Sequence, residues 1–306
     1  MGKYRTAPVA TTKMPGGVPY IISNEVAERY SFYGMRAILV VFMTQYLMGA
    51  GGEQDVMTET EATKYFHLFV AITYFTPLLG ALLSDIFLGK YKTIILLSLV
   101  YCGGHLALAV DDTRIGLAIG LGLIAVGSGG IKPCVSAHVG DQFGQTNQHL
   151  LSKVYGWFYI AINVGSFPSS LSTPWLLDRY GPAVAFGVPG VLMGIATIVF
   201  WSGRNKFVHI PAAGPGFLKE AVSPEGLRSL LNIGIVFVFV AVFWSLFDQT
   251  GSSWVLQAED LNRNLFGWNV LSSQMQAANP FLVSFFVPLY TYVIYLFVER
   301  VVPLTP

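Results

Sequence analysis

Four ionisable side chains lie close together in a segment that is otherwise apolar enough to cross a membrane. They are Glu25, Glu28, Arg29 and Arg36. On a helix, the side chains at positions 25, 29, 32 and 36 fall within about 60° of one another, and those at 28 and 33 flank that face. An unpaired charge at the centre of a bilayer costs roughly 2.5–3.5 kcal/mol. The alternative is a polar helix end in the lipid headgroups, but charges of both signs on one face favour a helix that lines a wet cavity. There the glutamates could take up protons and the arginines could bind an anionic group.

The composition is that of a membrane protein. Hydrophobic residues make up 53% of the chain and charged residues only 11%, with a mean hydropathy of +0.56. A soluble domain carries roughly 25% charged residues. The net charge of +1 is not the excess of positive charge that is typical of nucleic-acid-binding proteins, so no nucleic-acid partner is expected. The two cysteines lie in apolar stretches and suggest no disulfide framework. We expect no metal site and no cofactor.

About eight apolar segments have the length that a bilayer requires. They run from about 20 to 48, 62 to 88, 93 to 110, 115 to 139, 151 to 177, 183 to 201, 230 to 256 and 270 to 297. Proline and glycine are frequent between 203 and 228, which predicts a linker between two helical bundles. The expected organisation is a cytosolic tail over 1–18, a six-helix bundle over 19–203, a cytosolic linker over 204–228, and two helices of a second bundle over 229–306.

The loop charges predict the orientation. Eleven of the lysines and arginines fall on the amino-terminal side of the predicted spans and four on the opposite side. Basic residues are enriched in cytoplasmic loops, so the amino terminus is expected in the cytosol. The chain is therefore predicted to be a multi-pass protein of a lipid bilayer, most plausibly the plasma membrane.

Further polar residues lie inside the other predicted spans. His67 either sits as a polar residue at the membrane interface or accepts protons from an acidic medium. Lys132 follows a run of glycines; because Pro133 comes next, a nucleotide-binding loop is rejected in favour of close helix packing. Asn163 either bonds across helices or contacts a substrate. Trp244 and Asp248 are one helical turn apart, which suits an ammonium-bearing ligand.

The charges predicted to lie within the membrane balance. The cations are Arg29, Arg36 and Lys132, and the anions are Glu25, Glu28 and Asp248. Three against three is the ratio expected when buried charges pair. We expect Lys132 to pair with Asp248 across the two bundles.

Four runs of sequence carry a resemblance to a known family. They are Glu25-x-x-Glu28-Arg29-Tyr30-x-Phe32-Tyr33-Gly34, Gly129-Gly-Ile-Lys-Pro133, Phe158-Tyr-Ile-Ala-Ile-Asn-Val-Gly-Ser166 and Phe247-Asp248-Gln249. From about 19 to 300 the chain resembles the proton-dependent oligopeptide transporter family of the major facilitator superfamily. The surroundings of His67 resemble those of the animal di- and tripeptide transporters. The resemblance implies an all-α membrane protein in which two six-helix bundles rock around a central site, driving di- and tripeptide uptake with protons.

The resemblance also implies roles for individual residues. Proton coupling is expected at Glu25, Glu28, Arg29 and His67. Substrate binding is expected at Tyr33, Arg36, Tyr74, Lys132, Asn163, Trp244 and Asp248. One departure is Phe32, which replaces the first tyrosine of the family's usual pair, and the lost hydroxyl is expected to alter substrate affinity.

Three other functional classes compete with peptide transport. The same architecture carries nitrate and other small anions, which is the main alternative. An intramembrane aspartyl protease would need two facing aspartates, and only Asp248 lies deep in a predicted span. A receptor or channel would not require three balanced charge pairs. About eight of an expected twelve or more helices are predicted, so we expect an incomplete family member that does not transport by itself.

Overall fold

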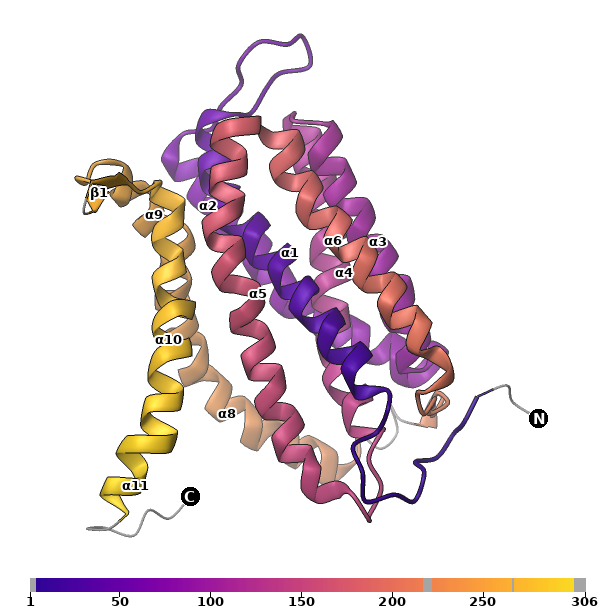
Figure 1. Ribbon diagram of the computed structural model, residues 1–306. Helices are drawn as coiled ribbons and strands as arrows, with labels where there is room; N and C mark the ends of the chain where they lie inside the picture. Colours follow the sequence, from indigo (N-terminus) through magenta and orange to yellow (C-terminus); the bar gives the residue numbers. More distant parts are fainter. Residues whose placement is uncertain (1–3, 217–221, 266, 300–306) are drawn as a thin grey trace.

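The structure is a computed structural model that describes residues 4–216, 222–265 and 267–299. Within these ranges the chain is built almost entirely from helices (Figure 1). Lys219 and Arg300, two of the cations used to predict the orientation, lie outside the described residues.

Six long helices make up the first two thirds of the chain. They are α1 (Val18–Gln45), α2 (Glu59–Leu82), α3 (Lys90–Val110), α4 (Arg114–Gly140), α5 (Leu151–Tyr180) and α6 (Pro182–Ser202). A π-helical turn, Leu83–Leu88, prolongs α2, and short 3-10 turns, Gln148–Leu150 and Gly203–Asn205, precede α5 and follow α6. The first six predicted segments match these helices to within a few residues.

These six helices pack side by side. Helix α1 packs against α5 and α6, α3 against α4 and α6, and α2 against α4. Polar side chains also join them, since the Ser31 hydroxyl donates to the Pro189 carbonyl over 2.6 Å and the Thr76 hydroxyl to the Ala125 carbonyl over 2.7 Å. A β-carbon at Gly80 would strike the α4 backbone at Gly130. The glycine run of α4 therefore serves close helix packing, as predicted.

The end of the bundle that holds residues 46–58 and 111–113 is called the loop end here. Thr58 begins α2 with a capping box, in which its hydroxyl accepts from the Glu61 amide and the Glu61 carboxylate accepts from the Thr58 amide. Arg114 forms a two-pronged ion pair with Asp55 at 2.7 and 2.9 Å. Hydrogen bonds from Thr113 lower the pKa of Asp111.

The opposite end, where α1 begins, is called the tail end. Residues 4–17 form no long helix and lie along the segment after α6, where Tyr4 stacks on His209 with ring centroids 4.2 Å apart. The Thr11 amide donates to the Thr146 hydroxyl over 3.2 Å. Lys90 forms an ion pair with Asp141 at 2.8 Å between α3 and the loop after α4. The tail is thus tied to the six helices.

The last third contains shorter elements. They are α8 (Pro224–Phe247), a 3-10 turn Asp248–Gly251, α9 (Ser253–Glu259), the strands β1 (Asn264–Leu265) and β2 (Trp268–Asn269), a 3-10 turn Ser272–Ala277, α10 (Ala278–Leu289), a π-helical turn Tyr290–Ile294, and α11 (Tyr295–Val298). The strands are antiparallel and pair Leu265 with Trp268. Helix α8 begins at Pro224, with Ser223 as its cap, within the range 204–228 in which the linker was predicted.

Two of the predicted spans are interrupted, which corrects the prediction of continuous helices there. The seventh breaks at the 3-10 turn Asp248–Gly251, where the helix-disfavouring sequence Asp-Gln-Thr-Gly gives the backbone an alternative to helical hydrogen bonding. The eighth begins with another 3-10 turn instead of an α-helix. The hairpin between them was not predicted from the sequence; Gly267, with φ of +88°, makes its tight turn.

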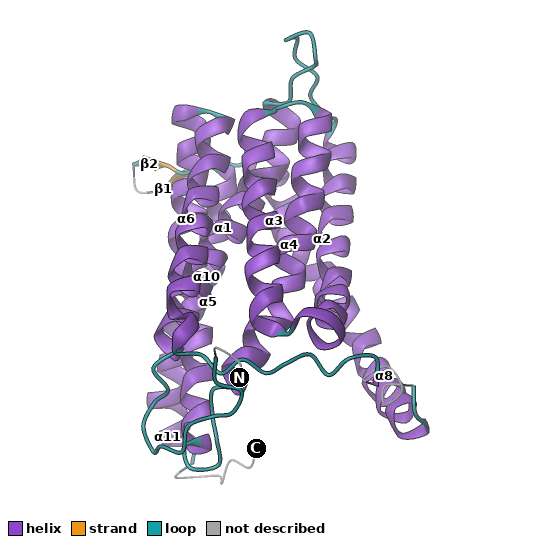
Figure 2. Cartoon of the chain, turned by 90° about the vertical axis from the view of Figure 1, so that its right-hand side faces the viewer, coloured by secondary structure: helices purple, strands orange, loops and turns teal. Residues whose placement is uncertain are grey.

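The two parts of the chain differ in burial. Helix α1 buries seventeen residues, whereas α8 buries no side chain in the described part of the chain. Figure 2 shows α8 diverging from the other helices at the bottom of the view. Five helical stretches among the described residues are long and apolar enough to cross a membrane: 59–88, 90–110, 114–140, 182–205 and 224–259. Helix α1 is not among them, and it is the helix with the clustered charges.

Candidate functional site

A cavity of about 970 Å³ lies between α1, α2, α4 and α5 on one side and α8, α9 and α10 on the other. Six of the seven predicted substrate residues line it: Tyr33, Arg36, Tyr74, Lys132, Asn163 and Trp244. The seventh, Asp248, does not line the cavity but contacts a residue that does. Residues that are more than 200 positions apart in the sequence therefore share one chamber.

The polar face predicted for α1 points into this cavity. Arg29, Phe32, Tyr33 and Arg36 all line it. Glu25 and Glu28 do not line it; they lie behind Arg29, whose Nε is 2.7 Å from Glu25 Oε1 and 3.2 Å from Glu28 Oε2. Both glutamates are at least nine-tenths buried. The three residues form a compact charge cluster within two turns of one helix.

Glu28 has a second partner outside α1. The Ser128 hydroxyl on α4 donates to Glu28 Oε1 over 2.8 Å. Ser128 belongs to the glycine-rich run, where small residues let α4 come close to its neighbours. The carboxylate is therefore held by one cation of its own helix and one hydroxyl of another.

The predicted pair of Lys132 with Asp248 is wrong. Asp248 instead forms an ion pair with Arg36, at 2.5 Å from Nη2. Both side chains are at least nine-tenths buried. Asp248 lies in the 3-10 turn that follows α8, and this turn contacts α1.

Lys132 forms no ion pair within the described part of the chain. Its ammonium lies over the ring of Phe32, 4.4 Å from the centroid. Two of the three predicted intramembrane cations are thus matched by the three carboxylates, and the third rests on an aromatic face.

His67 does not line the cavity. Its Nε2 lies 2.9 Å from the Ser252 hydroxyl, which directly follows the turn that holds Asp248. The histidine is partly buried and has a polar partner, and it is not part of the cavity wall. Its observed contact joins α2 to the segment between α8 and α9.

Two further hydrogen bonds join the same parts near the loop end. The Gln276 amide donates to the Ala37 carbonyl of α1 over 3.1 Å, and the Gln274 amide donates to the Leu171 carbonyl of α5 over 2.8 Å. Together with the pairs Arg36–Asp248 and His67–Ser252, they hold the loop-end parts of the cavity walls together. We call these four contacts the loop-end latch.

The remaining predicted residues supply aromatic and amide groups. The rings of Tyr74 and Trp244 are neighbours in the cavity wall, with centroids 6.2 Å apart and planes tilted by 49°. The Asn163 amide nitrogen donates to the Tyr159 carbonyl of its own helix over 2.8 Å, so the predicted bond across helices is not made. Its amide oxygen accepts no hydrogen bond within the described part of the chain, and it can accept one from a ligand.

Several polar residues of the cavity were not predicted. They are Thr73, Ser166, Ser170, Thr250, Gln276 and Asn279. Asn279 and Gln276 could have been recognised, because they are amides inside an apolar segment. The hydroxyls could not, since Ser and Thr occur throughout membrane helices with their hydrogen bonds satisfied by the preceding turn.

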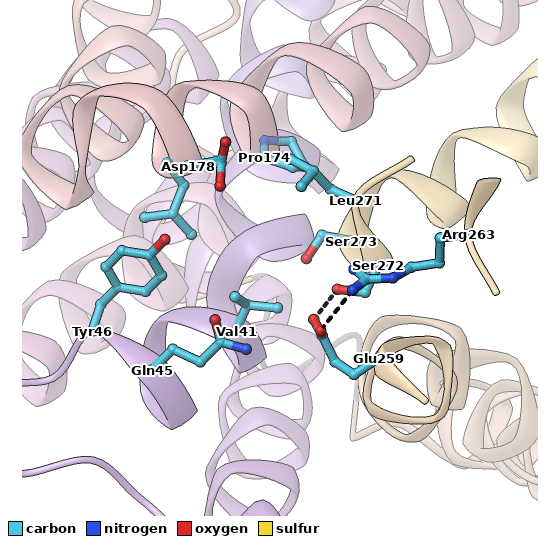
Figure 3. Close-up of a pocket in the computed structure, with 11 residues that line it drawn as sticks. Val41, Gln45, Tyr46, Pro174, Asp178, Glu259, Arg263, Leu271, Ser272 and Ser273 are labelled. Carbon is cyan, nitrogen blue, oxygen red and sulfur yellow. Dashed lines mark hydrogen bonds and ion pairs between the residues drawn. The ribbon is translucent and has the colours of Figure 1, made fainter. Parts of the chain in front are cut away.

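A second, smaller cavity of about 210 Å³ lies at the loop end (Figure 3). The end of α1, α5, α9 and the turn before α10 surround it. Glu259 accepts a hydrogen bond from Ser272 and lies 3.4 Å from Arg263. Burial and the carboxylates of Asp178 and Glu259 raise the pKa of Tyr46, which lies in its wall. None of the predicted site residues lies in this cavity, so the larger one is the candidate site.

The sequence matches known proteins over most of its length. A sequence model described as the POT family matches residues 91–223 and 215–306. Peptide transporter family 1 of Drosophila melanogaster is 38% identical over 92% of this chain and 43% of that protein. Solute carrier family 15 member 2 of Homo sapiens is 35% identical over 95% of this chain and 46% of that protein. The chain thus spans about half the length of these relatives or less.

Solved structures show the same architecture. The crystal structure of the POT family transporter PepTSo is 37% identical, with a TM-score of 0.81 over 96% of this chain and 72% of that chain. An auto-inhibited POT family peptide transporter is also 37% identical, with a TM-score of 0.81 over 94% of this chain and 70% of that chain. The fold predicted from the sequence, an all-α membrane protein of the major facilitator type, is confirmed.

Proposed function

The chain belongs to the POT family, a family of transporters, and from that premise we propose that its central cavity binds di- and tripeptides and couples their passage to protons. The observation that carries the proposal is the convergence of Tyr33, Arg36, Tyr74, Lys132, Asn163 and Trp244 on one cavity. Its volume of about 970 Å³ falls within the range of sites for small ligands. No catalytic step is assigned to any residue.

Lys132 is the residue proposed to hold the peptide carboxylate. It lines the cavity and forms no ion pair in the described residues, so its ammonium is available to an anion. A carboxylate bound by an ammonium forms a charge-assisted hydrogen bond, which is about twice as strong as a neutral one. Arg36 is less available in this arrangement, because Asp248 already neutralises it.

The peptide amine is proposed to lie toward Asn163 and the aromatic pair. The free amide oxygen of Asn163 accepts hydrogen bonds, and the rings of Tyr74 and Trp244 attract a cation by their faces. Asp248 comes within reach of the amine once it has left Arg36. The proposal thus keeps Asp248 as a substrate residue but makes its availability depend on the latch.

The proton is proposed to bind at the Glu25 and Glu28 pair, in a way that requires Glu28. Both carboxylates are buried, and Arg29 is the cation of their cluster as well as part of the cavity wall. A peptide that draws Arg29 toward the cavity would weaken its contacts with the carboxylates and so favour their protonation. His67 is proposed to take part from the loop end, where it contacts Ser252 beside the turn that holds Asp248.

Transport is proposed to proceed by alternating opening of the two ends. The loop-end latch closes one end, while α8 diverges from the six helices toward the other. We assign the loop end to the outside of the cell, the tail to the cytosol and the whole to the plasma membrane. Residues 19–203 are proposed to move as one bundle and 229–306 as part of a second one, with 204–228 as the cytosolic linker.

Transport of nitrate is not favoured as the alternative. The Drosophila relative and the auto-inhibited transporter are named as peptide transporters, and the cavity offers groups for both ends of a zwitterion. A site for a small anion would need only a cation such as Lys132. The amide and aromatic groups opposite Lys132 would then have no ligand.

The experiment is a binding assay with the purified chain in lipid nanodiscs. Radiolabelled alanyl-alanine is expected to bind saturably, to be displaced by unlabelled dipeptides, and to resist displacement by nitrate. Replacing Lys132 with Gln should weaken binding about tenfold or more, because a charge-assisted bond is lost. Lys64→Gln is the matched control, since Lys64 is an exposed cation outside the cavity. Displacement by nitrate but not by dipeptides would overturn the proposal.

A further inference from the structure

The three cations of the cavity wall are held in different ways. Arg29 lies against two carboxylates, and Arg36 lies against one. Lys132 has no carboxylate partner within the described ranges, and the ring of Phe32 takes that place. Among the described residues, the one cation of the cavity wall without a contacting carboxylate therefore rests on one phenylalanine.

The Phe32 ring is itself firmly held. It is 6% exposed and packs between α2 and α4. The Phe69 ring of α2 lies 6.3 Å from it, and the neighbouring Tyr33 ring meets it edge on at 5.6 Å. A ring with two such neighbours has one orientation, and in that orientation it presents its face to the Lys132 ammonium.

An aromatic face differs from a carboxylate in what it leaves free. The face attracts the ammonium electrostatically but does not neutralise its charge. An ammonium has three hydrogen-bond donors and no acceptor. A carboxylate partner would occupy some of these donors and would also neutralise the positive charge. On the ring, the ammonium keeps its full charge for a ligand. Arg36 provides the contrast, because it also lies over a ring, that of Phe66 at 5.4 Å, but its charge is matched by Asp248.

We propose that Phe32 is a positioning residue that sets the cavity's preference for ligands with a free carboxylate, by holding the Lys132 ammonium on its ring face without neutralising it. The inference rests on the proposed function, since the carboxylate belongs to a peptide. It also gives a reason why a residue without a hydroxyl serves at position 32. The face of the ring is the part that acts, and phenylalanine and tyrosine both have one.

The test compares alanyl-alanine with its carboxy-terminal amide as competitors in the nanodisc binding assay. The quantity measured is the inhibition constant of the amide divided by that of alanyl-alanine. This ratio reports how much the free carboxylate contributes to binding. Phe32→Leu should lower this ratio about tenfold, the size expected for loss of one desolvated cation–π contact. Phe32→Tyr should keep the ratio within about twofold, because the ring face remains.

Three further variants separate positioning from packing. Phe69→Leu removes a ring that packs on Phe32 but does not contact Lys132 directly, so it should lower the ratio less than Phe32→Leu does. Replacing Phe32 with difluoro- and then trifluoro-phenylalanine keeps the shape but withdraws electrons from the ring face. The ratio should fall stepwise with fluorination while the protein stays folded.

The outcomes distinguish this inference from the proposed function. A ratio that is unchanged in Phe32→Leu and in the fluorinated variants, with peptide still bound, would overturn the role of Phe32 alone. An equal fall in Phe69→Leu would do the same, since the effect would then be one of packing. Failure of the unaltered chain to bind either compound would overturn the proposed function and this role together.

Discussion

Two groups of buried charges border the cavity. One is formed within a single helix, and the other joins segments that are distant in the sequence. Glu25, Glu28 and Arg29 lie within two turns of α1, so their contacts survive any movement of one helix against another. Arg36 and Asp248 are 212 positions apart and join α1 to the turn after α8. Their contact exists only while those two segments are together.

The difference suggests a division of labour. A local cluster can gain or lose a proton while the helices stay in place, which suits it to store the coupling proton. A pair between distant segments breaks when they separate, which suits it to report and hold one conformation. The loop-end latch has this second construction throughout, since each of its contacts joins α1, α2 or α5 to a residue after position 247.

The largest effect is expected at the pair between distant segments. Asp248→Asn leaves the buried guanidinium of Arg36 without its anion, which should lower the free energy of unfolding by about 3 kcal/mol. Arg36→Leu should cost a similar amount, because it leaves the carboxylate unpaired. Chemical denaturation of the purified variants in lipid–detergent micelles measures both values.

The double variant Arg36→Leu/Asp248→Leu tests whether each single variant loses stability because it leaves one buried charge unpaired. Because it removes both charges, it should recover most of the stability lost in either single variant. If the losses of the two single variants simply add in the double variant, the two side chains are not coupled and the latch does not rest on this pair.

An intermediate effect is expected at the second contact of the latch. His67→Ala removes a single hydrogen bond to Ser252 and should cost about 1 kcal/mol. The same denaturation assay applies, with Ser252→Ala as the partner variant. Combining the two should cost no more than either alone, whereas fully additive losses would remove this hydrogen bond from the latch.

The two groups of charges also differ in how far the sequence could predict them. The contacts of the α1 cluster follow from spacing, since residues three and four apart meet on a helix. Glu25 was expected on the face that lines the cavity, but it lies behind Arg29. The partner of Asp248 could not be predicted this way. Spacing within the segment implied a continuous helix, but the 3-10 turn at Asp248–Gly251 decides which cation the carboxylate reaches.

The six helices α1–α6 were predictable for the same reason as the cluster. Each is a long apolar run with its caps and breaks nearby in sequence, such as Thr58 before α2. The strands of the hairpin before α10 have only two residues each, too few to show an alternating pattern. The hydroxyls of the cavity wall depend on contacts between distant segments. Apolar runs and residue spacing carry no direct signal for those contacts.

The smallest effect is expected at an ion pair away from both groups. Arg114 and Asp55 form good hydrogen bonds, but their side chains are 38% and 43% exposed. Exposed pairs contribute roughly 0.2–1 kcal/mol and are screened by salt. Arg114→Gln should therefore change stability by less than about 1 kcal/mol, and less still in high salt. A loss as large as that of Asp248→Asn would show that burial does not set the ranking.

The most direct test of the division of labour is the number of protons taken up when peptide binds. Calorimetric titration with alanyl-alanine in two buffers of different ionisation enthalpy measures this number in the nanodisc-bound chain. Glu28→Gln should abolish proton uptake while peptide still binds, because the carboxylate that stores the proton is gone. Arg36→Leu/Asp248→Leu, which leaves the local cluster intact, should retain it. Proton uptake that persists in Glu28→Gln and disappears in Arg36→Leu/Asp248→Leu would contradict the account.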